Sequence, residues 1–290
     1  AGQHLRPRKQ GDLMSSTPNP ELGHRIRAAG FDTNYHDQGN GHPVVMIHGS
    51  GPGVTAWANW RLNIGPLSKQ ARVLAPDMVG FGYTDAPAGT RYGLDTWVEH
   101  LVGFLDALEL DSVDLVGNSF GGGLALAIAA SRPERVRKLV LMGSVGIDFP
   151  LTPGLDAVWG YTPSIENMKG LLDVFAHDRK LVNDELAELR YRASTREGVQ
   201  ERFAQMFSPA PRQQYIQAMT TPEHKIRALP HETLVVHGRE DKVIPLSNAL
   251  TLASLIPRAQ LHVYPHCGHW TQIEWASSFN DMVGRFLAND

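Results

Sequence analysis

The sequence holds a single cysteine, Cys267, among 290 residues, so no disulfide can form within the chain. One thiol fits a reducing compartment, and we expect a cytoplasmic protein. No uninterrupted apolar run reaches the roughly 18 residues of a membrane-spanning helix. The N-terminus is basic and polar and lacks the apolar stretch of a secretory signal peptide. These absences argue against a secreted or membrane-bound protein.

Neither sign of charge is in large excess, because the formal net charge is -3. Nothing therefore favours binding to nucleic acid or to an anionic membrane. The 13 histidines are scattered and lack the paired spacing of a zinc site, so no metal is indicated. No motif signals another cofactor.

What the sequence does have is a repeated series of short apolar, β-branched segments. They cover residues 44–47, 72–74, 113–116, 138–142, 233–237 and 261–264. Two of the intervening segments, 95–108 and 121–130, have helical composition. Near-continuous apolar strands that alternate with helices predict a doubly wound α/β fold, with a mostly parallel sheet covered on both faces.

This alternation stops between residues 145 and 212. Prolines at positions 150, 153, 163, 209 and 211 separate amphipathic helical pieces such as 181–192, and no strand pattern falls among them. We expect residues 145–212 to form a helical lid inserted into a core of residues 21–144 and 213–290. Such a lid would exclude water and shape substrate choice. Residues 1–20 are expected to be a disordered leader, with Met14 as a candidate native start.

The segment Gly117-Asn118-Ser119-Phe120-Gly121 matches the G-x-S-x-G pattern of a nucleophile elbow. A strand pattern precedes it and a small-residue helical pattern follows it, as this motif requires. The flanking glycines remove side chains where strand and helix nearly touch, so the serine can occupy a strained turn with its Oγ exposed. The helix N-terminus supplies partial positive charge and free N–H groups. We expect Ser119 to be a nucleophile and not part of a simple connecting turn.

A serine hydroxyl needs a base that removes its proton. His269 follows the last predicted strand and so lies at the carboxyl edge of the sheet, where doubly wound folds place their sites. His266 is the nearest competitor for this role. His48 precedes a glycine-rich loop and is expected to brace it.

The base in turn needs an acid that fixes its tautomer and stabilises the imidazolium. Asp241 directly follows the predicted strand 233–237, and the chain order Ser119, Asp241, His269 is that of α/β hydrolases. Glu240 is the adjacent alternative. Two other aspartates are expected to be structural, in a loop and in the strand that leads to the nucleophile: Asp77 and Asp114.

An oxyanion hole needs two backbone N–H groups aimed at the developing charge. One should come from Phe120, directly after the nucleophile. The other should come from the glycine-rich loop 48–53, in which Ser50 is the expected donor. The loop has neither the lysine of a P-loop nor the G-x-G-x-x-G spacing, so it does not indicate nucleotide binding.

Five segments together resemble one family, the meta-cleavage-product hydrolases, and within it the 2-hydroxymuconate-semialdehyde hydrolase branch. They are HGSGPGVTAWANW (48–60), APDMVGFGYTD (75–85), GNSFGGG (117–123), LDAVWGYTPS (155–164) and CGHWTQIE (267–274). The resemblance runs from about residue 21 to 288. It implies an α/β-hydrolase fold, a homodimer, and cleavage of carbon–carbon bonds in ring-fission products from bacterial aromatic catabolism.

The resemblance implies a substrate of the 2-hydroxy-6-oxohexa-2,4-dienoate type, cleaved by water between C5 and C6. It implies Ser119, Asp241 and His269 as the triad and Ser50 and Phe120 as the oxyanion donors. The substrate contacts that it implies are Gly51, Asn59, Asn118, Arg190 and Trp270. An arginine fork suits the dienoate carboxylate and 2-oxygen, and with Asn118 and Trp270 it would assist ketonisation before Ser119 attacks C6.

Two other functions use the same residues differently. A general carboxylesterase would employ the same triad without needing Arg190. A ligand receptor on an inactive hydrolase scaffold would not need the triad at all, and the intact triad argues against it. Dehalogenases and epoxide hydrolases are disfavoured, because they have a carboxylate where this chain has Ser119.

Overall fold

The structure, a computed structural model, describes residues 17–290. The leader predicted over residues 1–20 therefore lies mostly outside the described residues, as does Met14. Residues 17–20 at its end run along the body of the protein, where the Asn19 side chain donates a 2.8 Å hydrogen bond to the Tyr83 hydroxyl.

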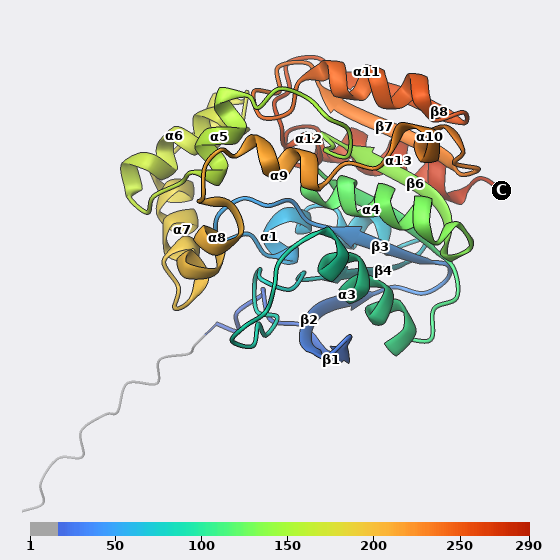
Figure 1. The fold of residues 1–290 in the computed structure, drawn as a ribbon, viewed down its shortest axis with the longest axis horizontal. Coiled ribbons are helices and arrows are strands. Elements are labelled where there is room, and N and C mark those ends of the chain that lie inside the picture. The colour runs from blue at the N-terminus through green and yellow to red at the C-terminus, as the bar shows by residue number, and fades with distance from the viewer. Residues whose placement is uncertain (1–16) are drawn as a thin grey trace, which may run out of the picture.

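One eight-stranded sheet organises the molecule, in the spatial order β1-β2-β4-β3-β5-β6-β7-β8 (Figure 1). The strands are β1 (His24–Ala28), β2 (Phe31–Gln38), β3 (Pro43–Ile47), β4 (Arg72–Pro76), β5 (Val113–Asn118), β6 (Val136–Met142), β7 (Glu232–Gly238) and β8 (Ala259–Tyr264). In this order, all neighbouring strands from β4 to β8 pair in parallel. Strand β1 pairs antiparallel with β2, and β2 pairs antiparallel with β4. The predicted α/β fold with a mostly parallel sheet is confirmed.

The sequence did not predict β1 and β2, although all six predicted strands are present as β3 to β8. The two missed strands form a hairpin at the sheet edge, in which most residues are polar and only four of the thirteen are buried. A search for apolar runs passes over such a hairpin. The run at 261–264, which was expected to be a buried strand, is instead part of the partly exposed strand β8 at the opposite edge of the sheet.

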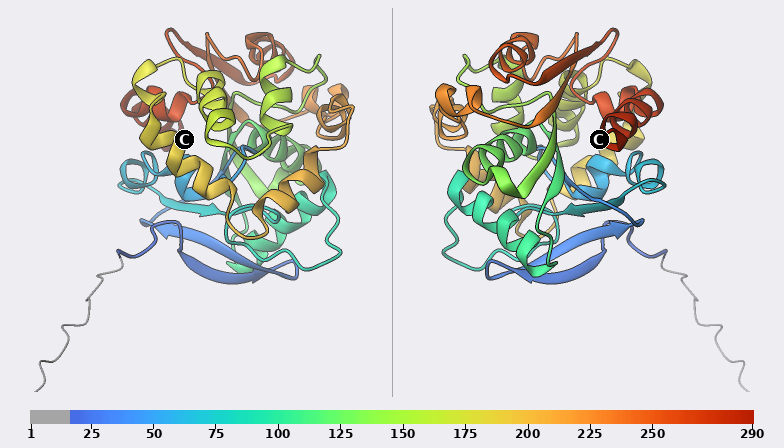
Figure 2. Two further views of the ribbon diagram at one scale, coloured as in Figure 1. Left: turned by 90° about the vertical axis from the view of Figure 1, so that its left-hand side faces the viewer. Right: turned by 90° about the vertical axis from the view of Figure 1, so that its right-hand side faces the viewer.

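Helices cover both faces of the sheet (Figure 2). One layer consists of α3 (Leu94–Ala107), α4 (Phe120–Ser131) and α11 (Leu246–Leu255), and its core includes Phe104, Leu124 and Leu252. The opposite layer includes α1 (Ala56–Trp60), α2 (Ile64–Leu67), α12 (Thr271–Glu274) and α13 (Ala276–Ala288), with Trp60 and Phe279 in its core. Helix α4 has almost no polar side chain because nearly all of its residues are buried between the sheet and its neighbouring helices.

The chain between β6 and β7 is helical and covers one end of the sheet (Figure 1). It contains α5 (Pro153–Trp159), α6 (Ile165–Phe175), α7 (Asp184–Ser194), α8 (Val199–Phe207), α9 (Gln213–Ala218) and α10 (Glu223–Arg227). Side-chain caps explain where three of these helices begin, because Thr152, Ser164 and Asn183 each accept a hydrogen bond from a backbone N–H in the first turn. The exact limits of the lid, 145 and 212, stay predictions.

No helix within residues 17–290 is both long and apolar enough to cross a membrane.

Candidate active site

Ser119 lies on a strained turn between β5 and α4. Its backbone angles are φ 57° and ψ -111°, a conformation that side-chain-bearing residues rarely adopt. The turn is possible because its flanking residues are glycines. A Cβ on Gly117 would lie 2.3 Å from the Gly121 carbonyl oxygen, and one on Gly121 would lie 2.2 Å from the Ile47 carbonyl oxygen. The sequence pattern therefore specifies a local shape that aims Ser119 at the carboxyl edge of the sheet.

His269 and Asp241 meet at the same edge, on loops that follow β8 and β7. The His269 Nδ1 lies 2.8 Å from Asp241 Oδ2, and Asp241 Oδ1 accepts hydrogen bonds from the backbone N–H groups of Val243 and Ile244 at 2.8 and 2.9 Å. Since Nδ1 donates to the carboxylate, Nε2 of the neutral ring keeps a lone pair with which it can accept a proton.

The Asp241 carboxyl is fully buried, and burial alone would raise its pKa. The charge and hydrogen bond of His269, the nearby His237 and the Ile244 N–H outweigh this effect, so the pKa lies below its ordinary value. Asp241 is therefore a carboxylate at neutral pH. A buried, ionised acid of this kind can stabilise an imidazolium that forms beside it.

His237 is a second imidazole at Asp241 that the sequence did not reveal. Its Nε2 donates to the Ile244 carbonyl oxygen at 2.9 Å and lies 3.3 Å from Asp241 Oδ2. Burial lowers the pKa of His237, which keeps the ring neutral. Its position as the penultimate residue of β7, on a side buried by the helices, gave no sign of this contact.

The competing candidates all have other partners. His266 is exposed, with its ring 6.0 Å from that of His177. Glu240 accepts a hydrogen bond from the Cys267 N–H at 2.9 Å instead of facing His269. His48 donates from Nδ1 to the Gly49 carbonyl oxygen and accepts at Nε2 from the Met78 N–H, so it braces the glycine-rich loop as expected.

The two aspartates that were expected to be structural are both buried and satisfied. Asp77 accepts hydrogen bonds from the Ala56 N–H at 2.7 Å, the Tyr83 N–H at 2.8 Å and the Asn34 side chain at 3.0 Å. Asp114 forms a two-point ion pair with Arg137. Neither faces Ser119.

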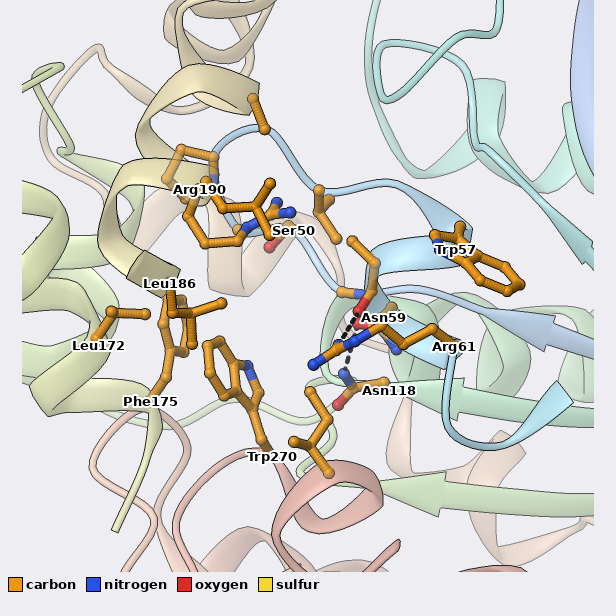
Figure 3. A pocket seen from close by; sticks show the side chains of 18 of the residues that line it. Ser50, Trp57, Asn59, Arg61, Asn118, Leu172, Phe175, Leu186, Arg190 and Trp270 are labelled. Carbon is orange, nitrogen blue, oxygen red and sulfur yellow. Dashed lines mark hydrogen bonds between the residues drawn. The ribbon is translucent and has the colours of Figure 1, made fainter. Parts of the chain in front are cut away.

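Ser119 and His269 both line a cavity of about 420 Å³. Figure 3 shows part of its lining, to which lid residues such as Leu186 and sheet-side residues such as Asn118 contribute. Every residue that is expected to contact substrate lines the cavity: Gly51, Asn59, Asn118, Arg190 and Trp270. Lid helices provide much of its apolar wall, including Leu155, Val158, Leu172, Phe175 and Leu186. The cavity thus has a polar floor on the sheet edge and an apolar roof.

Asn59 and Asn118 form the polar floor. Asn59 Oδ1 accepts hydrogen bonds from Asn118 Nδ2 at 3.0 Å and from the Gly49 N–H at 3.4 Å. Within residues 17–290, the Asn59 amide nitrogen and the Asn118 amide oxygen are buried without a hydrogen-bond partner. Because an unpaired buried polar group is costly, this donor and this acceptor indicate a polar ligand.

Arg190 reaches the cavity from α7 and is anchored at its tip. Its Nη2 donates to the Gly53 carbonyl oxygen at 2.8 Å. Burial lowers the pKa of its guanidinium, which nevertheless stays protonated in a protein. Trp270 packs face to face on Phe175, with ring centroids 5.0 Å apart, and so joins the His269 loop to the lid.

The two expected oxyanion donors come from two separate segments of the chain. Phe120 opens α4, where backbone N–H groups have no acceptor within the helix. Ser50 lies in the loop after β3, and its Oγ accepts a 3.0 Å hydrogen bond from the indole N–H of Trp159 in α5. This contact fixes the loop from the lid side, and the sequence did not predict it.

The residues that the structure describes include no group of three or more His, Cys, Asp or Glu side chains placed to hold a metal ion.

Comparison with known proteins places this geometry in a family. A family model described as the alpha/beta hydrolase fold matches residues 42–276. A solved meta-cleavage product hydrolase from Pseudomonas fluorescens, complexed with acetates, aligns with a TM-score of 0.92 and 59% identity, over 93% of this chain and 98% of that one. The chain belongs to the meta-cleavage product hydrolases. The family resemblance inferred from the five sequence segments is confirmed.

Two curated relatives show which members of this family the chain resembles in sequence. A 2-hydroxymuconate semialdehyde hydrolase from a Pseudomonas species is 64% identical over 93% of this chain and 95% of its own length. A 2-hydroxy-6-oxo-2,4-heptadienoate hydrolase from Pseudomonas putida is 60% identical over 93% of this chain and 98% of its own length. This meta-cleavage product hydrolase therefore has close relatives that are named for small ring-fission products.

Proposed function

We propose that this chain hydrolyses the C5–C6 bond of 2-hydroxy-6-oxohexa-2,4-dienoate-type ring-fission products, giving 2-hydroxypenta-2,4-dienoate and a carboxylic acid. The observation that carries the proposal is one cavity lined both by Ser119 and the Asp241-bound His269 and by Arg190. A hydrolase of simple esters needs only the first set. The names of the relatives support hydrogen or methyl as the C6 substituent.

In the proposed mechanism Ser119, His269 and Asp241 act as a triad. His269 Nε2 removes the Ser119 hydroxyl proton as Oγ attacks the C6 carbonyl, and the Asp241 carboxylate stabilises the imidazolium that results. The 2.8 Å hydrogen bond to His269 Nδ1 supports this assignment, because it fixes the tautomer. The backbone N–H groups of Ser50 and Phe120 would hold the negative oxygen of the tetrahedral adduct.

Cleavage first requires a proton on C5, because a C–C bond breaks readily only if the departing carbon can carry the electron pair. Transfer of the 2-hydroxyl proton to C5 gives the 2,6-dioxo form. When C5–C6 then breaks, the bonding pair moves into the 2-oxo system as a dienolate, and the C6 acyl group stays on Ser119. Water releases this acyl group as the carboxylic acid.

Arg190, Asn59, Asn118, Gly51 and Trp270 are proposed to hold the dienoate during these steps. The Arg190 fork suits a carboxylate with an adjacent oxygen. The unpaired Asn59 nitrogen and Asn118 oxygen offer one donor and one acceptor to the polar part of the substrate. Ordered binding by these groups would favour the keto form and align C6 with Ser119 Oγ.

A spectrophotometric assay tests the proposal. The purified protein is mixed with the yellow ring-fission products of catechol, 3-methylcatechol and 2,3-dihydroxybiphenyl. We expect rapid bleaching of the first two and its loss in Ser119→Ala. Preference for the biphenyl product would overturn the proposed C6 substituent. Hydrolysis of p-nitrophenyl esters with no bleaching of any dienoate would overturn the C–C hydrolase assignment in favour of an esterase.

Three further properties belong to the same proposal. Residues 145–212 act as a lid over the substrate, the enzyme is a homodimer, and it works in the cytoplasm. Size-exclusion chromatography with light scattering tests the dimer, and fractionation of the source cells tests the location. A monomer at micromolar concentration, or activity confined to a membrane or secreted fraction, would contradict them.

A further inference from the structure

Arg61 faces the same cavity, and nothing above gives it a role. It directly follows α1, two residues after Asn59. Its guanidinium Nη1 donates a 3.0 Å hydrogen bond to the Ala58 carbonyl oxygen. Arg61 lines the cavity, and Figure 3 shows its guanidinium pointing into that space from the side of α1, whereas Arg190 enters from α7.

Four arginines line this cavity, and among the described residues only one of them, Arg192, forms an ion pair with a carboxylate, that of Glu188. Within residues 17–290, none of Arg61, Arg190 and Arg196 forms an ion pair with a carboxylate. Arg196 instead lies over the Tyr83 ring, 3.7 Å from its centre. Among the described lining residues the only carboxylate is Glu21, whose Oε1 accepts a hydrogen bond from a threonine hydroxyl.

These cations act on one another. Burial has the largest effect on the pKa of Arg190 and lowers it; the Glu21 charge comes next and raises it, and the charges of Arg61 and then Arg196 lower it again. Burial also lowers the pKa of Arg61. Like charges gathered at one cavity raise the free energy of the empty protein, and an anion bound between them removes that cost. The chain as a whole is negative, at -3, so this positive site is local and not a consequence of overall composition.

We propose that Arg61 is a second substrate-binding guanidinium, which captures the carboxylate of an anionic substrate at the cavity mouth and holds it together with Arg190. The inference rests on the proposed function and deepens it, because it makes two cations, and not one, responsible for selecting anionic substrates. A positive cavity mouth raises the local concentration of an anionic substrate and its rate of association, and salt weakens both effects. Arg61 is partly covered at its guanidinium but exposed as a residue, whereas Arg190 is less exposed, so a substrate that enters from solvent can meet Arg61 first.

The test compares Arg61→Gln and Arg61→Lys with Arg132→Gln. Arg132 is an exposed arginine at the end of α4, outside the cavity, so its substitution removes the same charge elsewhere. Each variant is assayed with the ring-fission product of 3-methylcatechol and with p-nitrophenyl acetate, which is neutral. Measurements at about 20 mM and about 300 mM salt bracket strong and weak screening. Thermal denaturation confirms that each variant is folded.

Loss of one charge-assisted contact should lower kcat/KM for the dienoate about tenfold relative to the ester, mainly through KM. Arg61→Lys should recover part of this loss, and Arg132→Gln should match the unaltered enzyme. The decrease of kcat/KM with salt should be smaller in Arg61→Gln. An unchanged KM and an unchanged salt dependence in a folded Arg61→Gln would overturn the inference.

A second readout separates this inference from the proposed function. Hexa-2,4-dienoate, a carboxylate without the reacting ketone, is measured as a competitive inhibitor of ester hydrolysis. Its inhibition constant should rise about tenfold in Arg61→Gln, whether or not the enzyme cleaves C–C bonds. If the unaltered enzyme bleaches no dienoate but this shift occurs, only the proposed function fails. If dienoates are cleaved and the inhibition constant does not move, only the role of Arg61 fails.

Discussion

Glu274 joins the lid to the loop that carries His269, and its removal should impair both stability and catalysis. Its Oε1 accepts hydrogen bonds from the backbone N–H groups of His177 and Asp178 at 2.9 and 2.7 Å, just after lid helix α6. Its Oε2 accepts one from the Gly268 N–H at 2.7 Å. One carboxylate thus ties two segments that lie almost a hundred residues apart in the chain.

The size of the effect follows from these contacts. Each hydrogen bond to a charged group contributes about 1.5–3 kcal/mol, but the three share one half-buried carboxylate and water can replace part of them. We expect Glu274→Ala to lower the free energy of unfolding by about 2 kcal/mol, and hence Tm by about 3 °C in a chain of this length. The next residue after Gly268 is His269, and displacement of a catalytic group by ~1 Å can cost about a hundredfold in rate. We therefore expect kcat to fall about tenfold or more, with a smaller change in KM.

Thermal denaturation and steady-state turnover of the ring-fission product of 3-methylcatechol measure the two effects. Glu274→Gln keeps one acceptor oxygen but presents an NH₂ group to backbone donors, so it should be impaired as well, though less than Glu274→Ala. Glu197→Gln is the matched control, because Glu197 is exposed and lies outside the cavity lining.

Two results would refute this reasoning to different extents. If Glu274→Ala kept the Tm and the kcat of the unaltered enzyme, the carboxylate would not hold the two segments together. A lower Tm with an unchanged kcat would mean that the contact stabilises the fold without positioning His269.

Three further predictions follow from buried polar groups. Burial, and then the charge of His48, lower the pKa of His100 from its ordinary 6.5 to about 4, so the unfolded chain binds a proton that the folded chain does not. Stability should therefore fall as the pH drops from about 6.5 to about 4, and His100→Asn should show a shallower dependence of Tm on pH, whereas an identical dependence would contradict this. Burial raises the pKa of the Cys267 thiol, so a disulfide reagent should titrate one thiol in denatured protein and almost none in native protein, and fast native reaction would count against a buried thiol. Asn118→Ala and Asn59→Ala should each lower kcat/KM for the dienoate about tenfold, and because their side chains share a hydrogen bond the double variant should lose less than the product of the two, with strict additivity as the contrary result.

Local sequence patterns were sufficient to predict much of the fold and the candidate site residues that lie at strand ends. The pattern around Ser119 encodes part of its own geometry, because Gly117 is required by its contact with the Gly121 backbone, whereas Gly121 is required by the close approach of Ile47 from strand β3. Asp241 follows the buried strand β7 and His269 follows β8, the more exposed strand at the sheet edge, and parallel strands bring their carboxyl ends together. In these cases the local sequence places each residue at the end of a strand, and the order of the strands in the sheet brings the residues together.

Contacts between distant segments could not be predicted in the same way. Glu274 reads as an ordinary acidic residue of a short helix, and its role depends on where the chain after α6 lies. His237 reads as a strand residue, yet its ring lies 3.3 Å from Asp241. The Trp159 indole fixes Ser50 across 109 residues of chain. Composition and periodicity carry no information about such pairs, because each partner is compatible with its own local structure whether or not the other is present.

Contacts between distant segments also bear on how this enzyme selects its substrate. The groups expected to carry out bond cleavage lie on loops of the sheet, whereas Arg190 and the apolar wall belong to helices between β6 and β7. The Phe175–Trp270 stack, the hydrogen bond from the His269 N–H to the Phe175 carbonyl oxygen at 2.8 Å and the Glu274 contacts bind these two parts together. A change in a lid helix can therefore displace His269 as well as reshape the pocket. Substitutions that alter substrate preference in the lid should for this reason affect kcat together with KM, in contrast to Arg61, which lies outside the lid and should act mainly on KM.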